Sequence, residues 1–201
     1  MSPGHRRSSI PGGSTILTRE RRRNRRGSQG QGLVEFAIVG GLLFFLLFAI
    51  MNAGFYLYGA NAMQYSADIG VATIAAEGNY NNPVAPAPNN ADTVALSRMD
   101  AVGLNSTPLV KVTEVDIYKE TVTAGVFSDA STCGGGSTLC ENVYNASGVL
   151  QGALNWNPSV RNVGPTPDYA KLVIKFSYTL LIGTTTFNST TVNLFRLEPQ
   201  Q

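Results

Sequence analysis

The hydrophobic pattern of this chain of 201 residues begins with one long apolar run. From Phe36 to Tyr58 the residues are apolar, aromatic or glycine, and Asn52 is the only plainly polar side chain. A helix rises about 1.5 Å per residue, so this run is long enough to cross a hydrocarbon core of roughly 30 Å. The pattern therefore predicts a membrane-spanning segment at about residues 36–58.

Helical periodicity continues beyond the apolar run. Apolar residues recur at spacings of three and four, at Ala60, Met63, Ala67, Val71 and Ile74. Gly78-Asn79 is a typical stop signal. We predict one helix from about Leu33 to Glu77, whose first half lies in lipid and whose second half seats a domain through this stripe.

The remaining chain, residues 79–201, predicts a smaller α+β domain. Residues 79–90 are mostly Asn, Pro and Ala and indicate a linker, and residues 92–104 fit a short amphipathic helix. A period of two then predicts strands with these bounds: 109–118 with a bulge near Thr113-Glu114, 121–127 after a turn at Lys119-Glu120, 171–181, and 185–197 as the partner of 171–181 in a C-terminal hairpin. The fold class is therefore α+β, a long N-terminal transmembrane helix followed by a domain with an antiparallel sheet.

One segment of the domain stays ambiguous. Residues 142–163 show no clear period and contain the only Trp, Trp156. A large aromatic side chain of this kind more often covers one end of a core than binds a ligand.

Charge gives the predicted membrane helix a direction. Residues 1–30 hold eight arginines and one acid, Glu20, whereas the rest of the chain holds more acids than bases. A basic head before an apolar span favours a head in the cytoplasm and an exported C-terminal domain. A nucleic-acid-binding arm is the weaker alternative, because the adjacent span already explains the charge. Few large apolar residues occur in this head, so we expect it to be disordered or removed.

Glu35 stands at the very start of the apolar run. A carboxylate in a bilayer costs on the order of 3 kcal/mol near the centre and less near the headgroups. The helix dipole favours a negative charge in the first turn. If the chain were cut after Gly30, Gln31 would become the first residue, and its free ammonium would lie about one turn from Glu35. That ammonium, or the one of a neighbouring subunit, would offset the desolvation of the carboxylate.

These residues carry a family resemblance. Gly30 is followed five residues later by Glu35-Phe36, after a basic head and before an apolar helix, and this arrangement resembles a class III or type IVb prepilin leader. More specifically, residues 30–39 resemble the opening of TadE-like pseudopilins of tight-adherence (Flp) pili. The likeness continues through Phe48, Gly54, Tyr58, Gln64 and Ala67. Where that family usually has a proline, this chain has Gly40-Gly41.

The resemblance implies a processing site and a set of partners. Prepilin peptidase would cut between Gly30 and Gln31 on the cytoplasmic side, and Glu35 and Phe36 would take part in subunit packing. The mature chain would be a minor pilin or pseudopilin with a type IV pilin-like architecture. Its partners would be other pilins or pseudopilins, the peptidase, the pilus assembly platform and membrane lipid, without nucleic acid. It would pass the cytoplasmic membrane once, with its N-terminus inside.

The two cysteines, Cys133 and Cys140, enclose a glycine-rich loop. In an exported domain they predict a small disulfide, with two free thiols as the alternative. The only histidine, His5, lies in the basic head, so neither a metal site nor a His-dependent catalytic triad is expected in the domain. No cofactor is expected.

The acidic residues that come nearest to a calcium-binding pattern lie in the first predicted strand and in the turn after it. This acidic cluster consists of Glu114, Asp116 and Glu120, and the alternation of the first two favours a solvated strand face instead.

Two functions remain in competition. The first is a structural or assembly component of a tight-adherence pilus. The second is an uncleaved single-pass anchor that presents a β-rich binding module outside the cytoplasm. An enzyme is the weakest of the alternatives.

Overall fold

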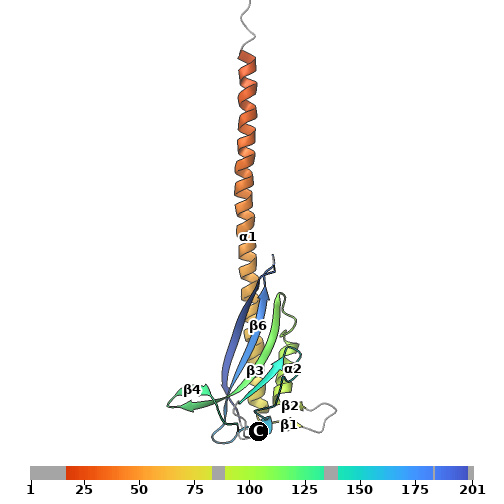
Figure 1. Ribbon diagram of the computed structural model, residues 1–201, viewed down its shortest axis with the longest axis vertical. Coiled ribbons are helices and arrows are strands. Elements are labelled where there is room, and N and C mark those ends of the chain that lie inside the picture. Colours follow the sequence, from red (N-terminus) through yellow and green to blue (C-terminus); the bar gives the residue numbers. More distant parts are fainter. Residues whose placement is uncertain (1–16, 83–88, 134–139, 183, 199–201) are drawn as a thin grey trace, which may run out of the picture. The chain divides into compact units, whose positions relative to one another are not determined.

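The computed structural model describes residues 17–82, 89–133, 140–182 and 184–198 (Figure 1). Contacts divide the chain into two units, Met1–Ile50 and Met51–Gln201. The first helix, α1, spans Leu17–Glu77 and so contributes to both units. It ends at the predicted residue but begins at Leu17 rather than near Leu33. Part of the basic head, which was expected to lack structure unless it is removed, is therefore helical, and arginine is a good helix former.

The second unit holds an antiparallel sheet of five strands: β3 (Val110–Thr123), β4 (Val126–Asp129), β5 (Glu141–Asn145), β6 (Tyr169–Thr179) and β7 (Thr186–Arg196). The strand order is β4-β3-β6-β7, and β5 also pairs with β3. The predicted C-terminal hairpin is confirmed as β6 and β7, which pair from Tyr169–Arg196 to Thr179–Thr186. A long apolar helix followed by an antiparallel sheet confirms the predicted α+β class.

Strand β3 differs from its prediction at one end. The expected bulge is present, as a register shift between Val112 and Glu114 against β6. The predicted turn at Lys119-Glu120 is wrong, because β3 continues to Thr123 and turns at Ala124-Gly125. Both turn residues have positive φ, 53° and 80°, as the tightest hairpin turns require. Lys119 and Glu120 stay in the strand, where both form ion pairs with neighbouring segments.

The second unit also contains several shorter elements. Helix α2 spans Ala91–Ala101 and begins with a capping box, in which the Asn90 side chain accepts from the Thr93 N–H while the Thr93 hydroxyl accepts from the Asn90 N–H. Within the expected linker, β1 (Asn81–Asn82) pairs with β2 (Asn89–Asn90), and residues 83–88 lie outside the described residues. A 3-10 turn, η1, spans Pro158–Val160.

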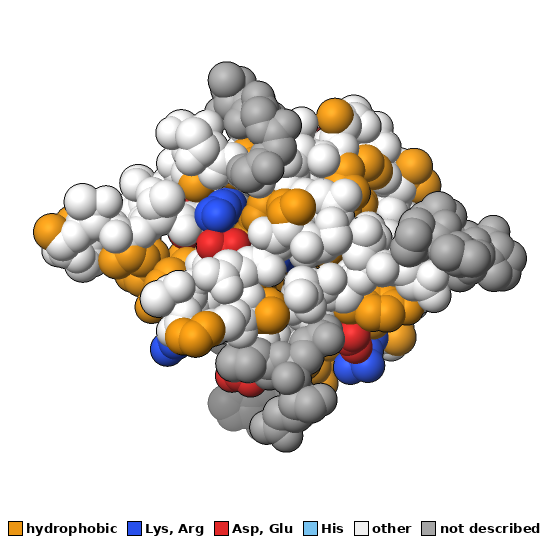
Figure 2. All heavy atoms as spheres, turned by 90° about the horizontal axis from the view of Figure 1, so that it is seen from below, with side chains coloured by type: hydrophobic (Ala, Val, Ile, Leu, Met, Phe, Trp, Pro, Cys, Tyr) orange, Lys and Arg blue, Asp and Glu red, His pale blue; other side chains and the backbone are white. Residues whose placement is uncertain are grey.

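The core lies between α1, α2 and one face of the sheet. Met63, Ala67 and Ile74 of the predicted α1 stripe are fully buried. They meet alternate residues of β6, Leu172, Ile174 and Phe176, together with Met99 of α2 and Trp156. Seen from below, this unit shows basic and acidic side chains next to one another among uncharged ones (Figure 2). Burial in α1 follows the helical spacing of three and four found in the sequence, and burial in β6 follows the period of two.

Candidate functional site

The predicted processing site lies on an exposed stretch of α1. Gly30 and Gln31 are exposed, and a Cβ added to Gly30 would meet nothing within 4 Å. The Gln31 Nε2 donates a hydrogen bond of 3.2 Å to Glu35 Oε1, one helical turn away. The chain as it stands therefore gives the Glu35 carboxylate a neutral partner from the residue that would become the N-terminus after cleavage.

The side chains that follow Glu35 form an apolar surface without cover from the described protein. Phe36 is exposed, and so are most of the large apolar residues after it, including Leu42, Leu43, Phe44, Phe45, Leu46 and Leu47. Within the described residues, one helical segment, Gly30–Glu77, is long and apolar enough to cross a membrane. A helix that is apolar on all sides is stable only when lipid or other helices surround it.

The N-terminal segment also decides the comparison with known families. The family model of TadE-like proteins matches residues 30–72. Over these residues the chain is TadE-like. The match begins at Gly30, the residue on which the predicted resemblance depends, and it confirms that resemblance. It covers about a fifth of the chain and leaves the sheet outside. Comparison with curated proteins and with solved structures gives no significant match.

After the apolar surface, the TadE-like segment packs closely against the rest of the second unit at two glycines. A Cβ at Gly59 would come within 2.6 Å of Val110 on β3, and one at Gly70 within 2.5 Å of the Met99 sulfur on α2. The helix backbone can therefore approach these neighbours closely only because glycine has no Cβ. Polar contacts add to this packing, because the Asn193 amide of β7 contacts both Gln64 and Asp68 at 2.8 and 2.7 Å.

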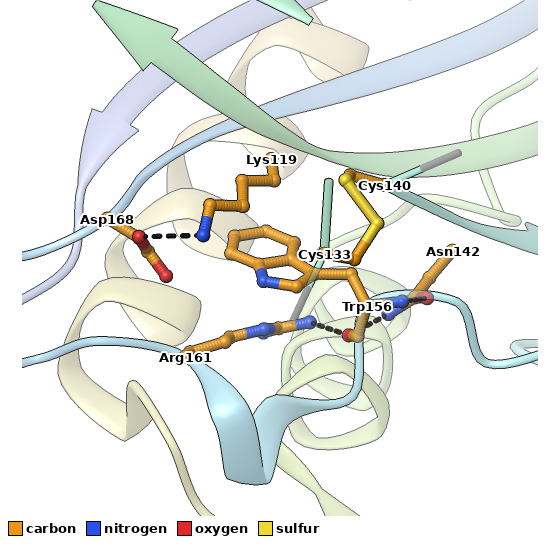
Figure 3. Close-up of a disulfide and its surroundings, with 7 residues drawn as sticks. All are labelled: Lys119, Cys133, Cys140, Asn142, Trp156, Arg161 and Asp168. Carbon is orange, nitrogen blue, oxygen red and sulfur yellow. Dashed lines mark hydrogen bonds and ion pairs between the residues drawn. A yellow bond between two sulfur atoms is a disulfide. The ribbon is translucent and has the colours of Figure 1, made fainter. Parts of the chain in front are cut away.

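The predicted disulfide between Cys133 and Cys140 is present, with Cα atoms 5.2 Å apart (Figure 3). Residues 134–139 of its loop lie outside the described residues. The Cys140 carbonyl accepts a 2.8 Å hydrogen bond from the Lys119 N–H, and Lys119 forms a 3.0 Å ion pair with Asp168. The disulfide therefore closes the β4–β5 connection, and the Lys119–Cys140 hydrogen bond attaches that connection to β3.

A buried ion pair that the sequence did not predict lies near this disulfide. Arg161 Nη2 donates to Asp92 Oδ2 at 2.8 Å, and Nη1 lies 2.6 Å from Oδ1 without hydrogen-bond geometry. Asn142 and the Tyr144 hydroxyl also donate to Asp92 Oδ2. Burial, with the nearby Asp92 carboxylate, raises the pKa of Tyr144. These contacts fasten α2 to the segment around residue 161.

Trp156 completes this cluster. Its side chain is fully buried, which confirms the predicted place in the core. The guanidinium carbon of Arg161 lies 4.3 Å from the indole centroid (Figure 3). The Trp156 backbone is held at both ends by Asn142, whose amide donates to the Trp156 carbonyl and whose Oδ1 accepts from the Trp156 N–H. The arrangement is a buried core contact, in which the Trp156 backbone is fully hydrogen-bonded while the indole Nε1 and the Arg161 Nε have no hydrogen-bond partner among the described residues.

The acidic cluster on β3 corrects another prediction. The expected solvated face is wrong, because Asp116 and Glu120 are buried. Lys175 of β6 bridges Glu114 at 2.5 Å and Asp116 at 2.7 Å, while Lys171 pairs with Glu120 at 2.8 Å and also with Asp129. The register of β3 and β6 places these opposite charges on the same sheet face.

The pKa values of the two carboxylates that Lys175 bridges shift in opposite directions. Burial raises the pKa of Asp116 to about 6, although Lys175 opposes the shift. The hydrogen bond from Lys175 lowers the pKa of Glu114, and both acids together raise the pKa of Lys175. Because lysines already neutralise these carboxylates, the cluster is a poor cation site. Among the described residues no group of His, Cys, Asp or Glu side chains could hold a metal ion.

Proposed function

We propose that this chain is a minor pilin or pseudopilin of a tight-adherence, type IV-like pilus, and that prepilin peptidase removes its basic head after Gly30. The observation that carries the proposal is the TadE-like match, which begins at that glycine. In this proposal the protein is a structural and assembly component and not an enzyme.

The exposed apolar surface supports this role. Before assembly, lipid would cover the side chains from Phe36 onward, with the N-terminus in the cytoplasm and the second unit outside. After assembly, helices of neighbouring pilins would replace the lipid, and close packing between helices would supply the attraction. Contact with lipid and contact with neighbouring helices both need apolar side chains that are exposed in the single chain, and those of this helix are exposed.

Glu35 links the proposed cleavage to subunit packing. In the uncleaved chain its carboxylate has a hydrogen bond from the neutral Gln31 amide. Cleavage after Gly30 would put a positive ammonium on that same residue. A nearby opposite charge stabilises a carboxylate that is out of water far more than a neutral donor does. Processing would therefore prepare Glu35 for a place among apolar helices.

The disulfide supports an exported domain. Disulfides form and persist in oxidising compartments outside the cytoplasm and are rare within it. The Cys133–Cys140 bridge therefore fits the orientation in which the second unit lies outside.

Substitution of Glu35 tests the proposal in cells that hold a complete pilus system. We expect Glu35→Gln protein to reach the membrane at the normal level and to fall at least tenfold in the pilus fraction sheared from the cells. Glu77→Gln is the matched control, because it changes a glutamate of the same helix outside the apolar run, and it should behave as the unchanged protein. Equal amounts of Glu35→Gln and unchanged protein in sheared pili would contradict the role proposed for Glu35, whereas normal pili that contain neither protein would favour the uncleaved anchor.

A further inference from the structure

The free end of the β6–β7 hairpin is unusual for a surface turn. From Phe176 to Phe195 the sequence has no charged residue. Three large apolar side chains near the end of the hairpin, Leu181, Ile182 and Phe187, are exposed. Thr184, Thr185 and Thr186 stand between these residues, but no charge accompanies them, so the exposed apolar side chains suit an environment less polar than water.

Asn52 fixes the hairpin end to α1. Its Oδ1 accepts a 2.9 Å hydrogen bond from the Leu181 N–H, and its carbonyl accepts a 3.2 Å bond from the Tyr178 hydroxyl. The rings of Tyr56 and Tyr178 meet edge to face, with centroids 5.6 Å apart. All of these residues lie in the second unit. The one plainly polar residue of the apolar run thus positions the hairpin beside the helix.

The position of Asn52 in the chain indicates where the membrane-spanning part of α1 ends. Residues 33–51 contain one charged side chain, Glu35, near their start, and as a helix they measure about 28 Å, close to the thickness of a hydrocarbon core. A span that ends at Met51 leaves Asn52 at the lipid surface. Tyr56 and Tyr58 then lie at headgroup level, where tyrosine is enriched, and both are exposed.

We propose that the end of the β6–β7 hairpin docks on the membrane, with Leu181, Ile182 and Phe187 in the outer interface of the lipid bilayer next to the exit of α1. The continuity of the chain favours lipid as the partner, because the hairpin is hydrogen-bonded to the residue that directly follows the span. Lys111 adds to the fit, because it is exposed on β3 opposite Ser177 and carries a positive charge that anionic headgroups would attract. The proposal rests on membrane insertion of the helix and moves the end of the span from Tyr58 to Met51.

Site-directed fluorescence on the full chain tests this docking. The native cysteines form a disulfide, so a single engineered cysteine can be labelled selectively with bimane. Ile182→Cys reports the hairpin end, and Val160→Cys is the matched control, since the two residues are 57% and 51% exposed. Val160 is three residues before Val163, which lies beside Gly78, directly after the C-terminal end of α1. Gly78 is about 39 Å from Asn52 along the helix axis. Phe45→Cys reports insertion of the helix itself.

Each labelled chain is reconstituted in vesicles of phosphatidylcholine and phosphatidylglycerol, with and without lipids brominated in the upper or the lower acyl chain. We expect upper-chain bromine to quench the Ile182 label at least twofold and to leave the Val160 label unchanged. Lower-chain bromine should quench the Phe45 label. A label at Phe187, introduced by Phe187→Cys, should repeat the Ile182 result, and unchanged Trp156 emission shows that each variant is folded.

Two outcomes would overturn the docking proposal alone. In the first, the Phe45 label is quenched but the Ile182 label behaves as the Val160 label does. In the second, the Ile182 emission shifts to the blue without quenching, because another protein surface covers the hairpin end. If the Phe45 label also escapes quenching, the helix is not inserted, and the membrane part of the proposed function fails with it.

Discussion

Removal of Arg161 should destabilise the domain strongly, because its partner would stay buried without a counter-charge. Both side chains of the Arg161–Asp92 pair are inaccessible to solvent. Breaking a buried pair by removing one member costs about 3–5 kcal/mol. Asn142 and Tyr144 would still donate to Asp92, so we expect Arg161→Ala to lower the free energy of unfolding by about 3 kcal/mol, at the lower end of that range.

Urea unfolding followed by tryptophan fluorescence measures this loss directly. Trp156 is the only tryptophan, and it lies against Arg161, so its emission reports this part of the core. With an m-value of about 2 kcal/mol per molar urea, the midpoint should fall by about 1.5 M. Arg98→Ala is the matched control. Its pair with Glu77 is 3.9 Å long and its own side chain is 60% exposed, so it should cost less than about 1 kcal/mol.

The double variant Asp92→Asn, Arg161→Met separates charge burial from lost packing. It removes both charges and should unfold at a higher urea concentration than Arg161→Ala does. Equal midpoints for Arg161→Ala and Arg98→Ala would refute the reasoning, because a buried pair would then contribute no more than an exposed one.

Three further predictions concern the same domain. Replacing both cysteines by serine opens a short loop and should lower the stability by about 2 kcal/mol in thermal or urea unfolding; no change under oxidising conditions would contradict this. Gly59→Ala should cost about 1–3 kcal/mol, because the added Cβ meets Val110, whereas Gly54→Ala has free space and should be neutral or slightly stabilising in the same assay. Burial raises the pKa of Asp116 to about 6, so the folded state holds its proton more tightly than the unfolded state does. The stability of the unchanged protein relative to Asp116→Asn should therefore fall as the pH rises from about 4 to about 6, and a rise over that interval would show that the carboxylate is stabilised in its charged form.

The parts of the fold that sequence alone could predict are those with a period of their own. The α1 stripe and the alternation of β6 each bury one repeating set of residues, so the pattern fixes the element and its buried face, whereas the apolar run is recognised by its length and its lack of charge. The TadE-like match likewise lies in a segment whose motif is local.

The parts that sequence could not predict depend on partners far along the chain. Asp92 and Arg161 are 69 residues apart, and Arg161 follows a segment without a clear period. Lys119-Glu120 resembled a polar turn, yet both side chains find ion-pair partners across the sheet. The true turn uses Ala124 at positive φ, a conformation that alanine rarely adopts and that no local pattern indicated.

The identity of the mature N-terminus tests the central claim most directly. The protein would be extracted from membranes of cells with an active prepilin peptidase, and its N-terminal peptide would be identified by mass spectrometry, since a terminal glutamine can cyclise and block stepwise sequencing. The account predicts a chain that begins at Gln31. A functional mature chain that still carries Met1 and the arginine-rich head would contradict it.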